Sequence, residues 1–191
     1  CFLVLPSRSR LANPDNLPVI KGLKGIHTRN TAAKIGDFSC SNPLFNRIYR
    51  LIDWAIRSNM ASVLTDCPHR EKLGWLEEAY LMGPSLRYNY DLATLYPKIL
   101  EDMRAAQLPN GLIPDIAPEY VPFHGGFRDS PEWGSAGVII PWEMYQWYGN
   151  VAVLQENYEM MKRYVDYLSS RADMHIVAHG LGDWFDYGPK Q

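Results

Sequence analysis

Apolar residues recur at intervals of three and four along much of the chain, which is the spacing that places them on one face of an α-helix. The pattern is clearest between residues 44 and 56, directly after a Ser-Asn-Pro run. Ser41 or Asn42 can cap a helix, and Pro43 suits its first turn, where an N–H has no partner anyway. The apolar positions that follow are Leu44, Ile48, Leu51, Ile52, Ala55 and Ile56. We therefore expect an amphipathic helix to begin here.

The same periodicity predicts four further helices. Their expected bounds are residues 73 or 75 to 88, 93 to 106, 133 to 148, and 152 to 170. Asp91 is a suitable cap for the second of these, and Asn150 or the residue before it for the fourth. Pro141 lies inside the third and is expected to kink it. One short strand is expected at residues 175–178. Because every other predicted element in this part of the chain is a helix, the predicted fold class is all-α.

The first 38 residues lack this helical pattern. Pro6, Pro14 and Pro18 interrupt any helix, and residues 19–20 and 26–28 resemble short strands separated by glycine turns. We expect residues 1–38 to be an irregular or β segment, either a linker or the tail of a preceding β-rich domain. The helical domain is then expected to occupy residues 39–191.

Two connections between the predicted helices are long and rich in aromatic residues. The first covers residues 108–131 and the second residues 180–188. Long loops in compact domains are usually functional or disordered, and the aromatic content of the first favours an ordered wall of a site. A place for Arg128 and Asp129 at the mouth of this site is the less favoured of the two interpretations of these residues. Short connections alternate with long connections that are rich in aromatic and acidic residues. This alternation suggests helical hairpins whose long loops gather at one end, as in a toroid of paired helices. No fixed-period repeat supports an ordinary solenoid.

Composition argues against several classes of function. The chain has 191 residues and a net charge of −2, whereas a nucleic-acid-binding domain is normally basic. It has no run of 18 apolar residues, so no membrane span is expected. Cys1, Cys40 and Cys67 show no paired spacing that would hold a metal, and neither a metal nor another cofactor is predicted.

The richest chemistry lies in one loop that precedes the second predicted helix. It contains Asp66, Arg70, Glu71, Trp75 and Glu78, with a proline and a glycine between them. Carboxyl groups can exchange protons with glycosidic oxygens, a guanidinium can bind hydroxyls, and an indole offers a flat apolar face to a sugar ring. The structural alternative is that the aspartate caps a helix, the arginine pairs with Glu77 or Glu78 at the surface, and the tryptophan anchors the core.

The run Asp-Cys-Pro-His-Arg-Glu-Lys-Leu-Gly-Trp, residues 66–75, resembles the central signature of the bacterial α-L-rhamnosidases, glycoside hydrolase family 78. Pro-Glu-Trp-Gly at 131–134, Pro-Trp at 141–142 and Gly-Asp-Trp at 182–184 follow in the order that this family shows. The run at residues 37–43 resembles the beginning of its catalytic domain. The resemblance covers residues 36–188.

The resemblance implies part of an (α/α)6 toroid and inverting hydrolysis of terminal α-L-rhamnose from a glycoside or polysaccharide. By position, Glu71 is the general acid. Many family members have an aspartate where Glu78 stands, and an extra residue before Leu-Gly-Trp. The residues expected to contact or surround the sugar are Asp66, Arg70, Trp75, Glu78, Trp133, Asp183 and Trp184.

An inverting mechanism needs a second carboxyl, the general base, at about 6.5–9.5 Å from the acid. The family places this base in a later helical hairpin, and no residue of this chain matches it. We therefore expect a fragment, the N-terminal half of the toroid, that is inactive without the remaining C-terminal helices of the same polypeptide. The alternatives are another inverting (α/α)6 glycosidase with a different sugar specificity, or a helical carbohydrate-binding or scaffold module without catalysis.

Overall fold

The computed structural model describes residues 22 and 24–182. In this part of the chain all regular elements are helices, and β-type pairing is limited to isolated bridges. The α-helices are α1 Pro43–Asn59, α2 Leu76–Leu81, α3 Gly83–Asn89, α4 Leu95–Ala106, α5 Pro131–Gly134, α6 Ala136–Tyr148 and α7 Val151–Arg171, and a 3-10 turn, η2, covers Gly125–Phe127. None of the described helices is both long enough and apolar enough to cross a bilayer.

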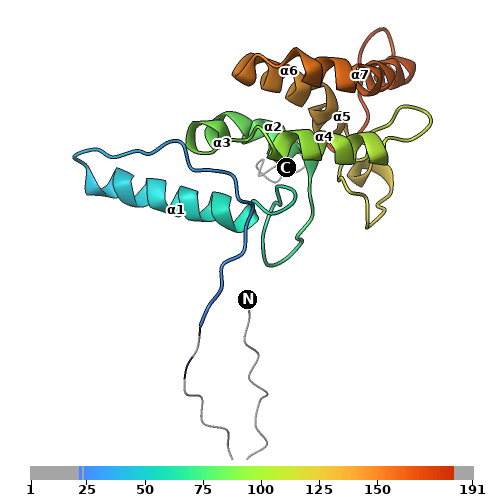
Figure 1. Ribbon diagram of the computed structural model, residues 1–191. Helices are drawn as coiled ribbons and strands as arrows, with labels where there is room; N and C mark the ends of the chain where they lie inside the picture. The colour runs from blue at the N-terminus through green and yellow to red at the C-terminus, as the bar shows by residue number, and fades with distance from the viewer. Residues whose placement is uncertain (1–21, 23, 183–191) are drawn as a thin grey trace, which may run out of the picture.

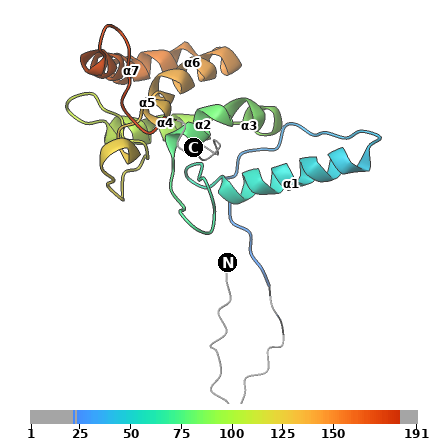
Figure 2. The same ribbon diagram turned by 180° about the vertical axis from the view of Figure 1, so that it is seen from behind.

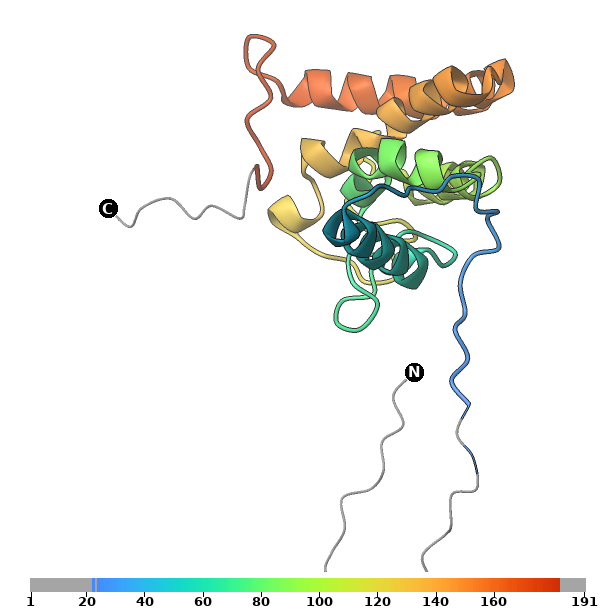
Figure 3. The ribbon, with the colours of Figure 1, turned by 90° about the vertical axis from the view of Figure 1, so that its left-hand side faces the viewer.

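The helices are arranged in tiers (Figure 1). α6 and α7 lie side by side as one outer tier, and α2, α3 and α4 lie beneath them. α1 lies on the opposite side of this middle tier, as the view from behind also shows (Figure 2). Seen from the side, the loop between α1 and α2 extends past α1, away from the tier of α6 and α7 (Figure 3).

The core lies between α2, α4, α6 and α7. Leu100 and Met103 of α4 and Ile140 of α6 are fully buried, and Tyr164 of α7 is 1% exposed. Gly134 makes this packing possible, because a Cβ there would lie 2.4 Å from the hydroxyl oxygen of Tyr164. These large side chains therefore interlock α5, α6 and α7 into one unit.

α1 is attached differently. It begins at Pro43, as predicted, and the Asn42 side chain accepts a hydrogen bond from the amide of Leu44 at 2.9 Å. Only Ile56 is buried along its 17 residues. Polar bonds hold the helix instead: a tyrosine on it donates to Asn89 at 2.7 Å, and Tyr90 donates to an aspartate on it at 2.5 Å.

Two predicted helices are each broken into two. The helix expected over residues 73–88 begins only at Leu76 and is interrupted at Met82, whose amide bonds back to Glu78 and Tyr80. Pro84 explains the break, because it has no amide to continue the ladder. The helix expected over residues 133–148 is α5 followed by α6, divided at Ser135. Pro141 lies inside α6, which continues through it to Tyr148.

The third and fifth predicted helices are confirmed with shifted ends. α4 begins two residues later than expected, at Leu95, because the Asp91 side chain accepts a bond from the amide of Ala93 at 3.0 Å and forms a turn ahead of the helix. α7 begins at Val151 and ends at Arg171, with the predicted Asn150 side chain as its cap.

Both strand predictions that fall on described residues are wrong. Residues 26–28 form no strand. Residues 173–176 form a tight turn in which Asp173 and Ile176 exchange both backbone bonds at 2.9 and 2.8 Å, and residues 177–178 after it are irregular. Met174 and His175 have φ of 45° and 67°, and this left-handed backbone prevents an extended strand. The strand expected at residues 19–20 lies outside the described residues. Residues 30–35 are an irregular segment whose backbone amides and carbonyls form hydrogen bonds with the backbone of Met60, Asn89 and Asp91.

Candidate active site

A short loop, residues 65–74, presents the predicted acids, and we call it the acid loop. The amide of Glu71 donates to the Cys67 sulfur at 3.1 Å, and the amide of Lys72 donates to the Cys67 carbonyl at 3.2 Å. Lys72 has a φ of 61°, and its carbonyl accepts a bond from the Tyr120 hydroxyl at 2.8 Å. A left-handed non-glycine residue held by its surroundings is a common mark of a functional loop. The loop therefore holds the Glu71 backbone in one defined position.

The acid loop is joined to the long loop at its far end. Leu76 donates its amide to the Asp115 carbonyl at 2.9 Å, and Ala117 donates to the Gly74 carbonyl at 3.2 Å. A Cβ on Gly74 would lie 2.9 Å from the carbonyl oxygen of Ala117, so only glycine allows this approach. We call the two bonds the backbone clamp. It fixes the two loops, about 40 positions apart in sequence, against each other.

A pocket of about 450 Å³ opens between these loops and the start of α2. Its residues are of two kinds, carboxylates from the acid loop and α2, and aromatic or aliphatic side chains from both loops and α5. Ten residues line it: Asp66, Glu71, Leu73, Trp75, Glu77, Glu78, Phe123, Phe127, Trp133 and Leu181. Phe123 and Phe127 place the long loop, which is predicted to be an ordered wall, along this pocket.

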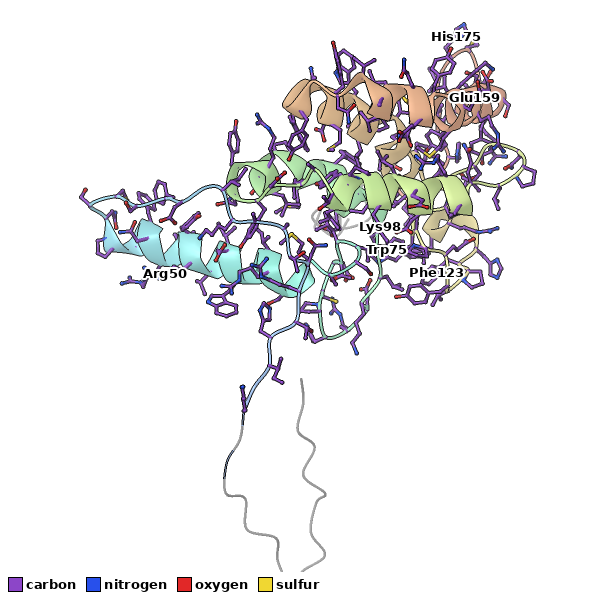
Figure 4. All side chains as sticks on the ribbon, viewed as in Figure 1. Arg50, Trp75, Lys98, Phe123, Glu159 and His175 are labelled. Carbon is purple, nitrogen blue, oxygen red and sulfur yellow. The ribbon has the colours of Figure 1, made fainter. Side chains whose placement is uncertain are left out.

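Trp75 is the centre of the aromatic side. Its ring stacks on Phe123 with centroids 5.4 Å apart and an interplanar angle of 24°, and it meets Trp133 edge-on at 6.3 Å. Trp75 and Phe123 lie beside each other at the same end of the molecule, far from His175 in the turn after α7 (Figure 4). Trp133 is only 7% exposed, so it supports the pocket wall from the core.

Glu71 lies at the open side of the pocket. One of its carboxylate oxygens accepts a hydrogen bond from the Trp75 indole nitrogen at 2.9 Å. Its other oxygen lies 3.9 Å from an Arg70 guanidinium nitrogen. The Arg70 side chain is 74% exposed and is not among the residues that line the pocket. The indole therefore orients the Glu71 carboxylate, and the arginine lies at the rim.

Glu78 and Asp66 lie deeper. Burial raises the pKa of Glu78, and repulsion from Glu77, Asp66 and Glu71 raises it further. One oxygen of Asp66 is inaccessible to solvent and has no hydrogen-bond partner in the described part of the chain. Both residues also line a second, largely apolar pocket of about 280 Å³ against α1. They therefore form the partition between the two pockets.

Asp115 belongs to the backbone clamp and not to the pocket lining, and the sequence did not single it out. It is fully buried, and burial raises its pKa to about 8, with further repulsion from Asp129, Glu132 and Glu77. One carboxyl oxygen accepts the Ser130 amide at 2.9 Å, and the other has no hydrogen bond. A lone aspartate between apolar residues looks like an ordinary loop residue in sequence, so no local pattern could reveal it.

Some predicted neighbours lie elsewhere. Arg128 and Asp129, candidates for the pocket mouth, line a separate cavity of about 350 Å³. Arg128 makes a two-pronged ion pair with Glu119, and Asp129 accepts bonds from Tyr167 and His179, so both side chains are drawn away from the acids. Asp183 and Trp184 lie outside the described residues. Over the residues that the structure describes, no three His, Cys, Asp or Glu side chains converge as metal ligands.

Several solved structures resemble this chain. The α-L-rhamnosidase from Dictyoglumus thermophilum superposes with a TM-score of 0.72 at 38% identity, covering 78% of this chain and 17% of its own. The Streptomyces avermitilis α-L-rhamnosidase complexed with L-rhamnose gives a TM-score of 0.74 at 33% identity, over 82% and 15%. The all-α prediction, as part of a six-hairpin toroid, is thereby confirmed.

Sequence comparison gives the same family. A curated α-L-rhamnosidase from Formosa agariphila is 34% identical over 172 residues, which is 85% of this chain and 18% of the relative. The chain thus spans less than a fifth of the length of this relative. Residues 33–191 match the bacterial alpha-L-rhamnosidase six-hairpin glycosidase domain. The chain therefore belongs to the family of bacterial α-L-rhamnosidase six-hairpin glycosidase domains.

Proposed function

We propose that the protein is a glycoside hydrolase that removes terminal α-L-rhamnose from glycosides or polysaccharides. The observation that carries this proposal is the pocket that Glu71, Glu78 and Trp75 line together. Aromatic faces stack on the apolar side of a sugar, while carboxylates bind its hydroxyls and exchange protons with the glycosidic oxygen. The relatives named above are α-L-rhamnosidases, and one of them was solved with L-rhamnose.

Glu71 is the proposed general acid. It lies on the solvent side of the pocket, where a leaving group can depart, and the Trp75 indole holds its carboxylate in place. In this mechanism the Glu71 carboxyl gives its proton to the glycosidic oxygen as the bond to the rhamnose anomeric carbon breaks. Water attacks from the opposite ring face and inverts the configuration, assisted by a second carboxyl at about 6.5–9.5 Å.

The proposed sugar contacts follow from depth in the pocket. Asp66 and Glu78 line its inner partition and are proposed to bind rhamnose hydroxyls, while Trp75 and Trp133 form the apolar side. Arg70 is proposed to act at the rim, because its side chain is 74% exposed. Asp183 and Trp184 are also proposed to contact the sugar, on the family resemblance alone.

The general base is proposed to come from helices of the same six-hairpin domain beyond this chain. In this arrangement residues 39–191 are the N-terminal half of the domain, residues 1–38 precede it, and the chain is inactive alone. The exposed apolar face of α1 supports this proposal, because Leu51 is 70% and Phe45 53% exposed. Further helices of the toroid would cover this face.

The test is rhamnose release from an aryl α-L-rhamnoside by the complete gene product. Replacement Glu71→Gln should lower kcat by about 10²- to 10⁴-fold, the usual contribution of a general acid, while rhamnose binding persists. An activated aryl leaving group needs less protonation by the acid. The decrease in kcat caused by Glu71→Gln should therefore be smaller for an activated aryl rhamnoside than for a natural glycoside. Glu159→Gln, on the exposed side of α7, is the matched control and should leave turnover unchanged.

Three results would contradict the proposal. Unchanged turnover by Glu71→Gln would remove this residue from the mechanism. Rhamnose binding by the unmodified protein without any release would identify a sugar-binding module instead. Robust turnover by the isolated 191-residue chain would show that no further helices are needed to supply a base.

A further inference from the structure

Ser130 lies where three segments that line the proposed sugar pocket meet. Phe127 comes from the long loop, Trp133 from α5 and Leu181 from the segment that follows α7, and all three side chains line the pocket of about 450 Å³. Because the segments are separate, their relative placement depends on contacts between them. Ser130 is 1% exposed and is bonded to each of these segments.

The backbone of Ser130 is fixed at the start of α5. Its carbonyl accepts the amides of Trp133 at 3.0 Å and Gly134 at 3.1 Å. Its own amide donates to a carboxyl oxygen of Asp115 at 2.9 Å. These main-chain bonds do not involve the serine hydroxyl, so they can remain when the hydroxyl is removed.

The hydroxyl of Ser130 joins the other two segments. It donates a hydrogen bond to the Gly126 carbonyl at 2.5 Å and accepts one from the Leu181 amide at 2.8 Å. A serine hydroxyl can make both bonds at once, because it has one O–H and two lone pairs. Gly126 directly precedes Phe127. One buried oxygen atom therefore holds the backbone at both Phe127 and Leu181.

Two glycines allow this close meeting. A Cβ on Gly180 would lie 2.9 Å from the Ser130 hydroxyl oxygen, and a Cβ on Gly126 would lie 2.9 Å from a methyl carbon of Leu181. Both distances are too short for a side chain to be added without displacing its neighbour. The spacing between the long loop and Leu181 is thus narrowly defined.

The segment after α7 also has an attachment that does not use this hydroxyl. A ring nitrogen of His179 lies 3.1 Å from a carboxylate oxygen of Asp129. This contact keeps the segment beside the long loop when the Ser130 hydroxyl is absent. Removal of the hydroxyl should therefore loosen Leu181 locally and leave the rest of the fold in place.

We propose, on the basis of the function proposed above, that Ser130 is a positioning residue for sugar binding. Its hydroxyl fixes Phe127 and Leu181 relative to each other, and so sets the shape of the apolar side of the pocket. Glu71 is held by other contacts, within the acid loop and with Trp75. Ser130 therefore affects how tightly the sugar is bound and not the transfer of the proton.

Ser130→Ala in the complete gene product removes both hydroxyl bonds and adds no atoms. The KM for an aryl α-L-rhamnoside should rise about five- to thirtyfold, the effect of one or two lost hydrogen bonds. Because the acid is unaffected, kcat should change by less than about threefold. Ser169→Ala removes an exposed hydroxyl that bonds within α7, and as the matched control it should change neither value. An unchanged KM, or a loss confined to kcat, would overturn the proposal.

A second variant disturbs the same contact and leaves the hydroxyl in place. In Gly126→Ala the new Cβ should displace Leu181, so KM should again rise while kcat is nearly kept. Thermal unfolding of each variant identifies misfolding, and this variant decides the question if Ser130→Ala does not fold. A KM equal to that of the unmodified protein would contradict a role for this spacing.

A double-mutant cycle tests whether Ser130 acts through the wall. Leu181→Ala should raise KM by itself, because it shortens a side chain that lines the pocket. Once that side chain is gone, loss of the Ser130 hydroxyl should matter less. The KM of the double variant should be at least about threefold below the value obtained by multiplying the two single effects. Effects that simply multiply would overturn the proposal.

Amide hydrogen exchange gives a readout that needs no sugar. In Ser130→Ala the Leu181 amide should exchange at least about tenfold faster, since its acceptor is gone, while the amides of α7 keep their rates. Unchanged exchange at Leu181, or equal acceleration throughout α7, would overturn the proposal even in a protein that releases rhamnose. Absence of rhamnose release by the unmodified protein would instead contradict the proposed function, so the two failures are distinguishable.

Discussion

α1 and α7 are both long, amphipathic and capped by an asparagine, yet their burial differs sharply. α7 buries Val153, Asn157, Met160, Tyr164 and Tyr167, whereas α1 buries only Ile56. Equal local signals thus produced two equally regular helices, one within a core and one beside it. The comparison shows that a cap and an apolar stripe specify a helix but not the surface that covers it.

The energetic difference is large. Full burial of an aliphatic or aromatic side chain stabilises the folded state by about 1.5–3 kcal/mol. α7 has gained this stabilisation, while much of the apolar face of α1 still faces solvent. We therefore expect α1 to open locally at a lower free energy than α7 in this chain.

Truncation of a side chain on each helix should give the largest contrast. Met160→Ala removes a side chain that is 3% exposed and should lower the free energy of unfolding by about 2–5 kcal/mol. Leu51→Ala, at a position that is 70% exposed, should change it by less than about 0.5 kcal/mol. Urea unfolding of the 191-residue chain provides both values.

The same pair of variants in the complete gene product sharpens the comparison. If the rest of the toroid covers α1, the cost of Leu51→Ala should increase to about 2 kcal/mol or more there. An equally small cost in both contexts would show that this face of α1 stays exposed to solvent.

Asp115→Asn should have the next largest effect on stability. Asp115 is buried close enough to Tyr164 of α7 to affect its pKa. The folded state raises the pKa of Asp115 to about 8, so the unfolded chain gives up this proton at lower pH than the folded chain. Stability contributed by the protonated form is complete below about pH 4 and is lost towards pH 8, by at most about 1.4 kcal/mol per pH unit. The Tm advantage of Asp115→Asn should therefore widen from pH 5 to pH 8. A constant difference would contradict the assigned protonation.

The smallest effect is expected at the two caps. Asn42 and Asn150 accept the same kind of bond, from amides at 2.9 and 3.0 Å. Asn150→Ala should reduce global stability by about 1 kcal/mol, whereas Asn42→Ala should mainly speed amide hydrogen exchange within α1. Equal losses of global stability in the two variants would show that α1 unfolds together with the core.

Helix positions were accessible from the sequence because caps and apolar spacing are local signals. α1 and α7 begin within a residue of their predicted starts for this reason. The break at Met82 was missed because the apolar pattern continues across it, and Pro84 decides the outcome. The turn at residues 173–176 was predicted as a strand because a left-handed methionine and histidine leave no trace in apolar periodicity.

The sequence could predict only part of the candidate site, namely the part whose residues are close together along the chain. Asp66, Glu71, Trp75 and Glu78 lie within one short run, so their convergence in the pocket needed little tertiary information. Phe123 and Trp133 approach Trp75 through long-range packing, and the sequence indicated only an aromatic loop. Arg128 lines a separate cavity, and sequence proximity to aromatic residues does not reveal its ion pair with Glu119.

The backbone clamp has a consequence for engineering. It joins Gly74 and Leu76 to Ala117 and Asp115 through main-chain atoms, with no room for a Cβ at Gly74. Side-chain substitutions that spare Gly74 and introduce no proline leave these two bonds in place, whereas a one-residue insertion between Glu71 and Gly74 would displace the acid relative to Phe123. Transplanting the acid loop into another scaffold would therefore require residues 108–131 to be moved with it, as a single cassette.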